Sequence, residues 1–401
     1  MKKKRCQWLL AVILVFAMLT GCGGAGSSEE TKSAEKETTA AASNETKSDA
    51  SEAITITDLD GKEYTFDKPL DKVIVQWSGA GGPFMTMAAL FGEEFYQHIA
   101  AIDNTLQDNR ADMYEQYVKD VPGIADIPMV KGMDSDEFDM ELALSCGAEA
   151  AIVPIGLKAS IQDSVQPKLE AAGIPVIYID YHAETRENHI QSTEIMGKLF
   201  GKEDRAQELI DFYTGHVDPI FEKVEEILKT EERPTVYVEV GMNGPDEYGN
   251  SNANGYMWGA MIYNAGGYSI ATDVLESAGA VEPEFVLSSN PENIIFAGSY
   301  WPANATSIRM GFQADEATTR ELVDAYLARP GWSELDAVKN NEISVLHHGV
   351  AREIYDCSSQ EAVAKAIWPE EFADLDPTAT LKEYYDTFLP FEFSGLWYLE
   401  Y

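Results

Sequence analysis

Histidine and arginine side chains follow candidate strands in the second half of the chain. His347 and His348 come directly after a β-rich run at 342–346, and Arg309 and Arg352 also follow predicted strands. Histidine is the commonest metal ligand in proteins, and the planar fork of arginine matches carboxylate, catecholate or hydroxamate oxygens. We therefore predict that Arg309 and Arg352 bind an anionic ligand, with surface salt bridges as the alternative. Adjacent histidines after a strand project to opposite sides, so one of the two could face a cleft and the other the core. Direct ligation of a metal by His347 or His348 is one interpretation, and plain polar lining or a core histidine is the alternative.

Aromatic and amide side chains gather after other predicted strands. The segment 241–256 is rich in Asn, Gly and Tyr, and it follows a β-rich run at 235–240. Aromatic rings combined with amides suit a large, flat ligand with a polar rim. Packing in the core is the alternative for each ring taken singly. The predicted ligand contacts of this kind are Asn243, Tyr248, Tyr256, Trp77, Tyr300 and Trp301.

A glycine-rich loop at 78–83 follows the first β-rich run, at 72–76. It resembles a dinucleotide-binding fingerprint, but Phe84 stands at the third glycine position, so the match is weak. Ser78 and Gly79 could present backbone N–H groups to ligand oxygens, or the loop could be an ordinary tight turn. Lys131 is a further, weaker cationic candidate. The sequence contains neither HExxH nor GxSxG, and we expect no catalytic residues.

The elements that must position these residues alternate between strand and helix. The remaining β-rich runs lie at 150–154, 175–180 and 293–297, and a helical pattern at 160–172 ends at Gly173. Alternating strands and helices indicate parallel sheets and an α/β fold. A strongly helical region at 189–229, which Gly201 interrupts, separates the runs into two sets. Its second part would be a rigid spacer between two lobes with a cleft between them.

The two sets of strands carry a similar unit. In the first, Glu141 precedes Glu149 by eight positions and a buried strand follows; in the second, Glu284 and Glu292 have the same spacing. Both units have Leu-Ser between the two acidic residues. This repetition suggests a pseudo-symmetric pair of lobes, and chance similarity between short helix–strand units is the alternative.

The N-terminus has the composition of an export signal. Residues 1–21 combine four basic residues, a short apolar stretch and a small-residue cleavage site, and the stretch is too short to span a bilayer. The LTGC sequence at 19–22 resembles the bacterial lipobox, in which the cysteine is lipidated, so we predict a lipid on Cys22. Residues 23–52 contain no Ile, Leu, Val or aromatic residue and are predicted to be a disordered tether.

Net charge and cysteine content narrow the class of protein. The formal net charge of −39 repels nucleic acid and anionic lipid headgroups, although a local basic pocket can still bind an anion. Cys146 and Cys357 could form one disulfide outside the cell. Their wide separation in sequence favours two separate thiols.

Several segments together resemble the substrate-binding proteins of ABC importers that carry iron–siderophore, haem or vitamin B12 cargo. The resemblance extends from about residue 54 to the C-terminus. It rests on LFGKEDRAQEL at 199–209, NAGGY at 264–268, the unit at 284–295 and AKAIWPEEFADLDP at 364–377. The chain departs from the family where Leu-Lys-Pro-Asp is usual, because it has SCGAE at 145–149 and Pro-Glu at 291–292.

The resemblance implies a class III periplasmic-binding fold, in which two Rossmann-like α/β lobes are joined by one long interlobe helix. The corresponding division is a signal peptide at 1–21, the lipidated cysteine and tether at 22–52, an N-terminal lobe at 53–186, a helical segment at 187–232, and a C-terminal lobe with terminal helices at 233–401.

The resemblance also implies a function. We expect a monomeric, lipid-anchored extracytoplasmic protein that binds an iron chelate and delivers it to an ABC permease and its ATPase, with no cofactor of its own. Glu141 and Glu284 would dock on the permease, since exposed carboxylates near helix starts can pair with arginines. Solvated helix-start acids are the alternative for these two residues. Cobalamin or haem cargo, or a membrane-tethered metalloenzyme on a similar two-lobed fold, are the alternatives for the function.

Overall fold

The computed structural model describes residues 53–79 and 81–401. The predicted signal peptide, Cys22 and the whole of the predicted tether lie outside the described residues. Within the described ranges, no helix combines the length and apolarity that crossing a membrane requires. Cys146 and Cys357 are both free thiols, in agreement with the interpretation from their spacing.

A parallel four-stranded sheet forms the centre of the N-terminal lobe. Its strand order is β4-β3-β5-β6, and every neighbouring pair is parallel. The sequence predicted three of these strands, but it did not predict β4. The strands are β3 (Val73–Val75), β4 (Ile99–Ile102), β5 (Ala150–Pro154) and β6 (Val176–Ile179), with a hairpin of β1 (Ile54–Thr57) and β2 (Glu63–Phe66) beside them.

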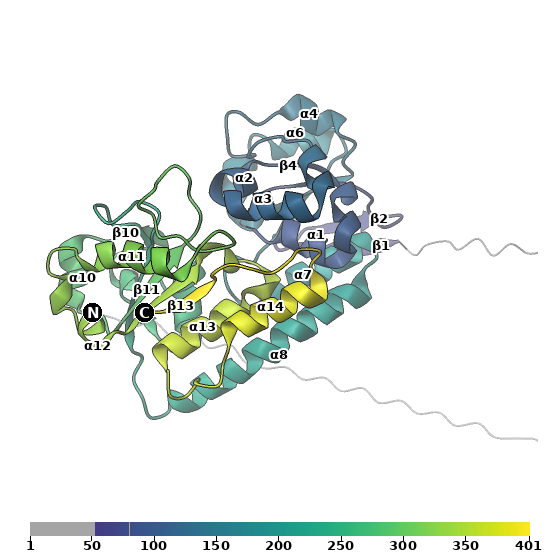
Figure 1. Cartoon of the computed structure of the whole chain (residues 1–401). Coiled ribbons are helices and arrows are strands. Elements are labelled where there is room, and N and C mark those ends of the chain that lie inside the picture. The colour runs from purple at the N-terminus through teal and green to yellow at the C-terminus, as the bar shows by residue number, and fades with distance from the viewer. Residues whose placement is uncertain (1–52, 80) are drawn as a thin grey trace, which may run out of the picture. The chain divides into compact units, whose positions relative to one another are not determined.

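Short helices connect the strands of this lobe (Figure 1). The predicted helix at 160–172 is two helices, because Pro167 removes a backbone donor and begins a second one. Gly173, with φ at +85°, ends the second helix as expected. The helices are α1 (Pro83–Phe91), α2 (Thr105–Asn109), α3 (Ala111–Asp120), α4 (Met140–Ser145), α5 (Lys158–Ile161) and α6 (Gln166–Ala171).

The C-terminal lobe has a five-stranded sheet in the order β13-β12-β11-β7-β9, in which only β13 is antiparallel to its neighbour. The three predicted strands of this lobe form its centre. The strands are β7 (Thr235–Val240), β9 (Tyr268–Ser269), β11 (Asn293–Gly298), β12 (Ile343–His347) and β13 (Tyr398–Glu400), and a small hairpin pairs β8 (Asn250–Asn252) with β10 (Ala278–Ala280). The helices are α9 (Met257–Asn264), α10 (Pro283–Ser289), α11 (Glu316–Leu327), α12 (Asp336–Asn340), α13 (Cys357–Ile367) and α14 (Pro377–Phe388).

Two successive helices lead from the first lobe to the second. Helix α7 (Arg186–Phe200) ends at Gly201, whose left-handed backbone terminates it, and α8 (Glu203–Ile227) follows. The predicted break and the predicted long second helix are both confirmed. Helix α13 packs against α8, and α14 packs against α13 and α1 (Figure 1). Accordingly, the largest hydrophobic cluster joins N-terminal strands and helices to side chains from α14 and the C-terminal segment.

The second acidic residue of each similar unit, Glu149 in the N-terminal lobe and Glu292 in the C-terminal lobe, makes the same kind of hydrogen bond to a neighbouring strand. The Glu149 carboxylate accepts a hydrogen bond from the backbone N–H of Asp71, just before β3. The Glu292 carboxylate accepts one from the N–H of Thr235, the first residue of β7, at 2.7 Å. In each lobe the acid therefore ties one parallel strand to the amino end of its neighbour. This correspondence supports the predicted pseudo-symmetry.

Candidate ligand-binding site

A cavity of about 360 Å³ lies between the two lobes, where the carboxyl ends of several strands meet. Ligands of open α/β sheets bind at such strand ends. The N-terminal lobe contributes Gly79, Asn109 and Arg110. The larger contribution comes from the C-terminal lobe, and it includes Asn252, Tyr256, Met257, Ser299, Trp301, His348 and Arg352.

Two arginines from different lobes approach each other in this cavity. Arg110 and Arg352 are both buried. Burial, followed by the charge of Arg110, lowers the pKa of Arg352 to about 10, so the guanidinium remains charged at neutral pH. Of the described residues that line the cavity, none is Asp, Glu or Cys. The cavity is therefore a local cationic site within a strongly acidic protein.

The acidic group nearest to Arg110 neutralises it only in part. Glu353 Oε1 lies 3.7 Å from Arg110 Nη1, and both side chains are buried. Burial raises the pKa of Glu353 to about 8, although Arg110 and Arg352 act in the opposite direction. A large share of Glu353 is consequently protonated at neutral pH, and the two arginines lack a full counter-charge.

Polar atoms that line the cavity lack hydrogen-bond partners. Arg110 Nη2, Asn252 Oδ1 and Ser299 Oγ are all buried and, among the described residues, have no partner. Buried polar groups are almost always hydrogen-bonded in folded proteins, because leaving one unpaired costs about 1–3 kcal/mol. Unpaired donors and acceptors that converge on one cavity indicate a polar ligand that would satisfy them.

The backbone around the cavity is strained. Met257 and Arg352 have φ values of 46° and 75°, a region that residues other than glycine rarely adopt. Trp77, next to the cavity loop, has a φ of 52°. Such strain costs of the order of 1–3 kcal/mol per residue and concentrates at functional sites.

The two histidines at the end of β12 are neutral rings rather than free metal ligands. Nδ1 of His347 accepts from the Gly349 N–H, and Nδ1 of His348 accepts from the Trp258 indole N–H, each at 3.0 Å. Burial and the nearby arginines hold both pKa values well below the usual range, so both rings are neutral. A neutral ring that accepts at Nδ1 carries its proton on Nε2. Neither ring therefore offers a lone pair to a metal, contrary to the suggestion from sequence.

Five of the residues singled out from the sequence line the cavity: Gly79, Tyr256, Trp301, His348 and Arg352. His347 does not, because its ring is fully buried against Trp397. The predicted projection of the two adjacent histidines to opposite sides is thus observed, with only His348 on the cavity side.

The N–H groups of Trp77, Ser78 and Gly79, at the start of the glycine-rich loop, are not available to a ligand. The buried Asp103 carboxylate accepts from the N–H groups of Trp77 and Ser78 and from the Ser78 hydroxyl, and Thr105 Oγ1 accepts from Gly79 N–H. The predicted backbone contact through Ser78 is therefore not available, and the ring of Trp77 does not line the cavity but packs against His182, with 4.8 Å between the ring centroids. The Gly79 backbone packs closely against another segment, since a Cβ there would lie 2.7 Å from the Leu106 backbone.

The other predicted contacts also lie outside the cavity. Tyr248 packs in the C-terminal lobe, where its hydroxyl accepts from Trp332 Nε1 at 2.7 Å and its ring faces Arg329. Arg309 lies over the ring of Tyr300, 6.0 Å from its centroid. The remaining two are Asn243, which is exposed, and Lys131, whose carbonyl accepts from Gln76.

Sequence reasoning missed Arg110, Asn109 and Ser299. Arg110 lies between the short helices α2 and α3, after the strand that was not predicted. A signal was present, because arginine is scarce in so acidic a chain. Gly349 packs against the Arg110 guanidinium, where a Cβ would come within 2.7 Å of Cζ.

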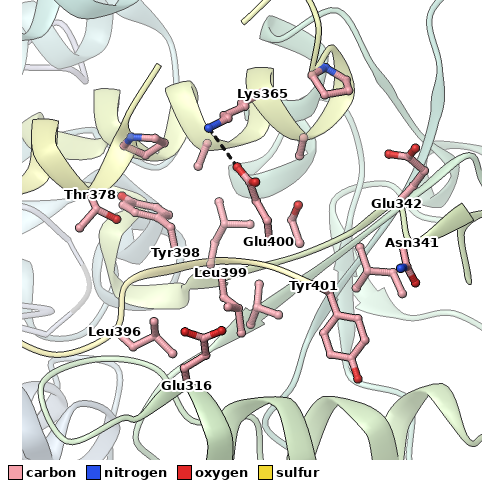
Figure 2. Close-up of a pocket in the computed structure, with 18 of the residues that line it drawn as sticks. Glu316, Asn341, Glu342, Lys365, Thr378, Leu396, Tyr398, Leu399, Glu400 and Tyr401 are labelled. Carbon is pink, nitrogen blue, oxygen red and sulfur yellow. Dashed lines mark ion pairs between the residues drawn. The ribbon is translucent and has the colours of Figure 1, made fainter. Parts of the chain in front are cut away.

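A second cavity, of about 430 Å³, lies within the C-terminal lobe beside β12 and β13 (Figure 2). Lys365 and Glu400 form an ion pair of 3.1 Å across it, and Glu316 and Glu342 also line it. None of the predicted ligand contacts lines this cavity. Its acidic lining makes it a poor site for an anion.

Glu141 and Glu284 occupy equivalent places in the two lobes. Each is exposed in the first turn of a short helix, α4 or α10 (Figure 1). Neither residue lines the interlobe cavity. This placement leaves both carboxylates free to contact another protein.

Comparisons with known proteins agree with this architecture. A family model described as periplasmic binding protein matches residues 155–348. The crystal structure of the TroA-like periplasmic binding protein FepB from Veillonella parvula is 45% identical, covers 86% of this chain and 99% of that chain, and has a TM-score of 0.82. The uncharacterized ABC transporter substrate-binding lipoprotein YvrC of Bacillus subtilis is 22% identical over 382 residues, which cover 93% of this chain and 100% of that protein. The molybdate-bound MolA of Haemophilus influenzae shares the fold, at 15% identity and a TM-score of 0.61, over 85% of this chain and 99% of that one.

The chain therefore belongs to the periplasmic binding protein family and has its two-lobed class III fold. It is the substrate-binding component of an ABC transporter, a class of protein that works with a permease and an ATPase.

Proposed function

We propose that the protein captures an anionic iron chelate of the siderophore type in the interlobe cavity and delivers it to its permease without catalysing a reaction. The observation that carries this proposal is the pair of buried arginines, Arg110 and Arg352, which approach from opposite lobes. One anion that bridges them would relieve their mutual repulsion and satisfy unpaired groups on both walls.

The lining argues against a free metal cation. A site for bare Fe³⁺ would need carboxylate or other anionic ligands, and the described lining has arginine, asparagine and neutral histidine instead. The His348 Nε2–H would add a donor for a ligand oxygen. The same protonation disfavours the alternative of a metalloenzyme with a metal on His347 or His348.

The size of the cavity bears on the choice of chelate. A volume of about 360 Å³ is near the small end of ligand pockets, which span about 300–1,000 Å³. It favours a compact carboxylate or hydroxamate chelate over haem or cobalamin. A second candidate is a tetrahedral oxyanion, since the same arginines and amides suit one and the relative MolA was crystallised with molybdate.

The site would be presented at a membrane. We propose that Cys22 carries a lipid anchor and that Glu141 and Glu284 dock on the permease. Their equivalent, exposed positions on the two lobes support the proposal, because a permease that contacts both lobes can meet both carboxylates.

The test is a binding panel on the full-length protein purified in detergent. Trp301 lines the cavity, so tryptophan fluorescence should report occupancy by ferric citrate, a ferric hydroxamate, haem, cobalamin or molybdate. We expect a ferric chelate to bind with micromolar or tighter affinity and the variant R352Q to bind it at least tenfold more weakly. Molybdate binding without ferric-chelate binding would replace the iron assignment. A ligand whose affinity is unchanged in R352Q would contradict the anionic site itself.

A further inference from the structure

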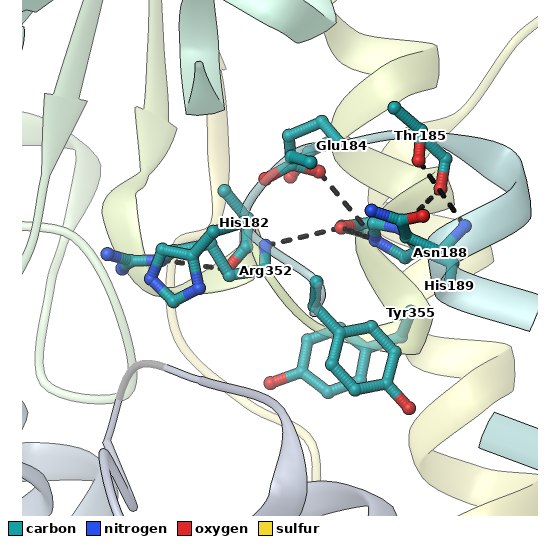
Figure 3. Close-up of polar contacts among 12 residues, drawn as sticks. His182, Glu184, Thr185, Asn188, His189, Arg352 and Tyr355 are labelled. Atoms are coloured by element: carbon teal, nitrogen blue, oxygen red, sulfur yellow. Dashed lines mark hydrogen bonds and ion pairs between the residues drawn. The ribbon is translucent and has the colours of Figure 1, made fainter. Parts of the chain in front are cut away.

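A buried polar cluster lies directly behind Arg352. Glu184 precedes α7, His189 lies on α7, and Asp356 ends a short 3-10 helix before α13 (Figure 3). One potential ligand atom from each of the three lies within 4.8 Å of the other two, and all three side chains are buried. The cluster thus joins the start of the interlobe helices to the C-terminal lobe.

The hydrogen bonds of His189 indicate whether a proton or a metal ion joins its ring to the Asp356 carboxylate. His189 Nδ1 is 2.9 Å from the Thr185 carbonyl oxygen, which can only accept, so Nδ1 carries a proton. Its Nε2 is 2.7 Å from Asp356 Oδ2. In a neutral ring Nε2 would be a second acceptor facing a carboxylate oxygen. A proton or a metal ion must therefore join these two atoms.

The distance favours a proton. Two atoms that ligate one tetrahedral metal at about 2.1 Å stand about 3.4 Å apart. A separation of 2.7 Å is instead that of a charge-assisted N–H···O bond. Burial alone would lower the pKa of His189, but the Asp356 carboxylate and the hydrogen bonds to Asp356 and Thr185 raise it above its usual value. His189 is accordingly an imidazolium paired with the Asp356 carboxylate.

The same carboxylate oxygen holds Arg352. Asp356 Oδ2 accepts from the Arg352 backbone N–H at 3.2 Å, and Arg352 is the residue with φ at 75°. From this conformation its guanidinium reaches the cavity, where Nη2 donates to the His348 carbonyl and Nε to the Ala351 carbonyl. These bonds fix part of the guanidinium and leave further N–H groups for a ligand.

We propose that His189 and Asp356 are positioning residues for cargo recognition: their ion pair fixes the strained Arg352 backbone and so orients the guanidinium toward an anionic cargo. The inference rests on the proposed function, because it requires that Arg352 binds the cargo. Burial and the neighbouring Asp356 carboxylate raise the pKa of Glu184 well above its usual value, so Glu184 adds little negative charge behind the guanidinium, and its Oε1 has no hydrogen-bond partner among the described residues. Neither His189 nor Asp356 lines the cavity, so both act through Arg352.

The chain offers a matched control for the test. His216 Nδ1 and Glu361 Oε1 form another histidine–carboxylate pair, between α8 and α13, also at 2.7 Å. The Glu361 side chain is buried, and the structure gives it no contact with Arg352 or the cavity. Loss of the carboxylate charge of either Asp356 or Glu361 should lower the stability of the protein, but only the loss at Asp356 should affect Arg352.

The experiment compares D356N, E361Q and R352Q in the full-length protein, with ferric citrate as the probe. We expect D356N to weaken binding at least tenfold and E361Q to leave it within twofold, although both lower the melting temperature. H189Q, which can still donate to Asp356 but cannot hold both partners, should be intermediate and serves if D356N fails to fold. Equal affinities of D356N and E361Q would overturn the proposal. If R352Q itself binds normally, the proposed anionic site fails instead.

A second measurement needs no cargo. In ring-proton NMR spectra at neutral pH, His189 should show two protected N–H signals, which identify the imidazolium. The Arg352 Nε–H signal, assigned by its loss in R352Q, should shift in D356N and stay in place in E361Q. A single ring N–H signal for His189, or an Arg352 Nε–H signal that does not shift in D356N, would overturn the positioning role even if ferric citrate does not bind.

Discussion

The two lobes are alike at the amino ends of their strands and different at the carboxyl ends. At the amino ends, Glu149 and Glu292 make equivalent hydrogen bonds to the neighbouring strand. At the carboxyl ends, the C-terminal lobe supplies most of the cavity, whereas the N-terminal lobe supplies one charged side chain, Arg110. We infer that the shared features stabilise the fold and that the features that differ between the lobes recognise the ligand. The predictions below test this division.

The largest effect, on uptake of the cargo, is expected for Glu141 and Glu284, the two exposed glutamates that occupy equivalent places in the lobes. The double variant E141K/E284K should abolish uptake of the cargo by cells, because both proposed contacts with the permease would become repulsive, while the affinity of the purified protein stays unchanged. The control E203K/D204K makes the same change in charge on exposed residues of α8. A loss of cargo affinity in the docking variant would place these glutamates in recognition instead.

The second prediction ranks the two walls of the cavity. R352Q should weaken ferric-citrate binding about 100-fold and R110Q about tenfold, since a charged hydrogen bond contributes about 1.5–3 kcal/mol and the C-terminal wall makes more of the contacts. R309Q is the control, because Arg309 lies outside the cavity. Fluorescence titration measures all three. A larger loss in R110Q would reverse the assignment of the dominant lobe.

The third prediction concerns pH and the boundary between the lobes. Burial raises the pKa of Glu353 from its usual 4.5 to about 8. Its neutral form stabilises the fold fully below about pH 4.5, and this contribution is lost as the pH rises toward 8. A tenfold difference in proton affinity between the folded and unfolded states corresponds to about 1.4 kcal/mol of stability.

In E353Q, the free energy of unfolding should therefore decrease less between about pH 5 and pH 8 than it does in the unmodified protein. Urea denaturation at both pH values measures the free energy of unfolding of each variant. E361Q, which alters another buried carboxyl group, provides the comparison. An unchanged slope in E353Q would show that Glu353 is ionised in the folded protein.

The smallest effect is expected at the paired acids. E149Q and E292Q should each lower the free energy of unfolding by about 1 kcal/mol, because each loses a charge-assisted hydrogen bond, at a partly exposed site for Glu149 and an exposed site for Glu292. For Glu149, burial alone would raise the pKa, but the bond from Asp71 N–H and the Lys68 charge lower it overall. Its contribution is therefore present above about pH 4.5 and is lost as the pH falls below that value. Clearly unequal losses at neutral pH would argue against structural equivalence.

The sequence predicted the architecture well because the architecture depends on local patterns. Runs such as 150–154 and 235–240 are apolar enough to be buried strands in either lobe, and Gly201 ends a helix by its backbone freedom. The strand β4 was not predicted from the sequence, because Ile99–Ile102 is short and contains two alanines, which weaken its β-propensity.

The site was predicted less well because it depends on pairings between distant residues. Trp77 and Ser78 follow a strand as a binding loop should, but a carboxylate 25 residues further on occupies their N–H groups. Likewise, nothing near Tyr248 in the sequence shows that Arg329 and Trp332 cover it. Arg110 became a cavity residue only because the fold brings the end of α2 and the segment after β12 to the same cavity.

The interlobe helix has a consequence for the energetics of transport. Because α8 runs as one element between the lobes and α13 packs against it, we infer that the separation of the cavity walls changes little when cargo binds. A preassembled site loses little entropy on binding, so it can hold a scarce nutrient tightly. Under the proposed function, the same rigidity would make release depend on the permease, which would have to separate the lobes through its contacts with both of them.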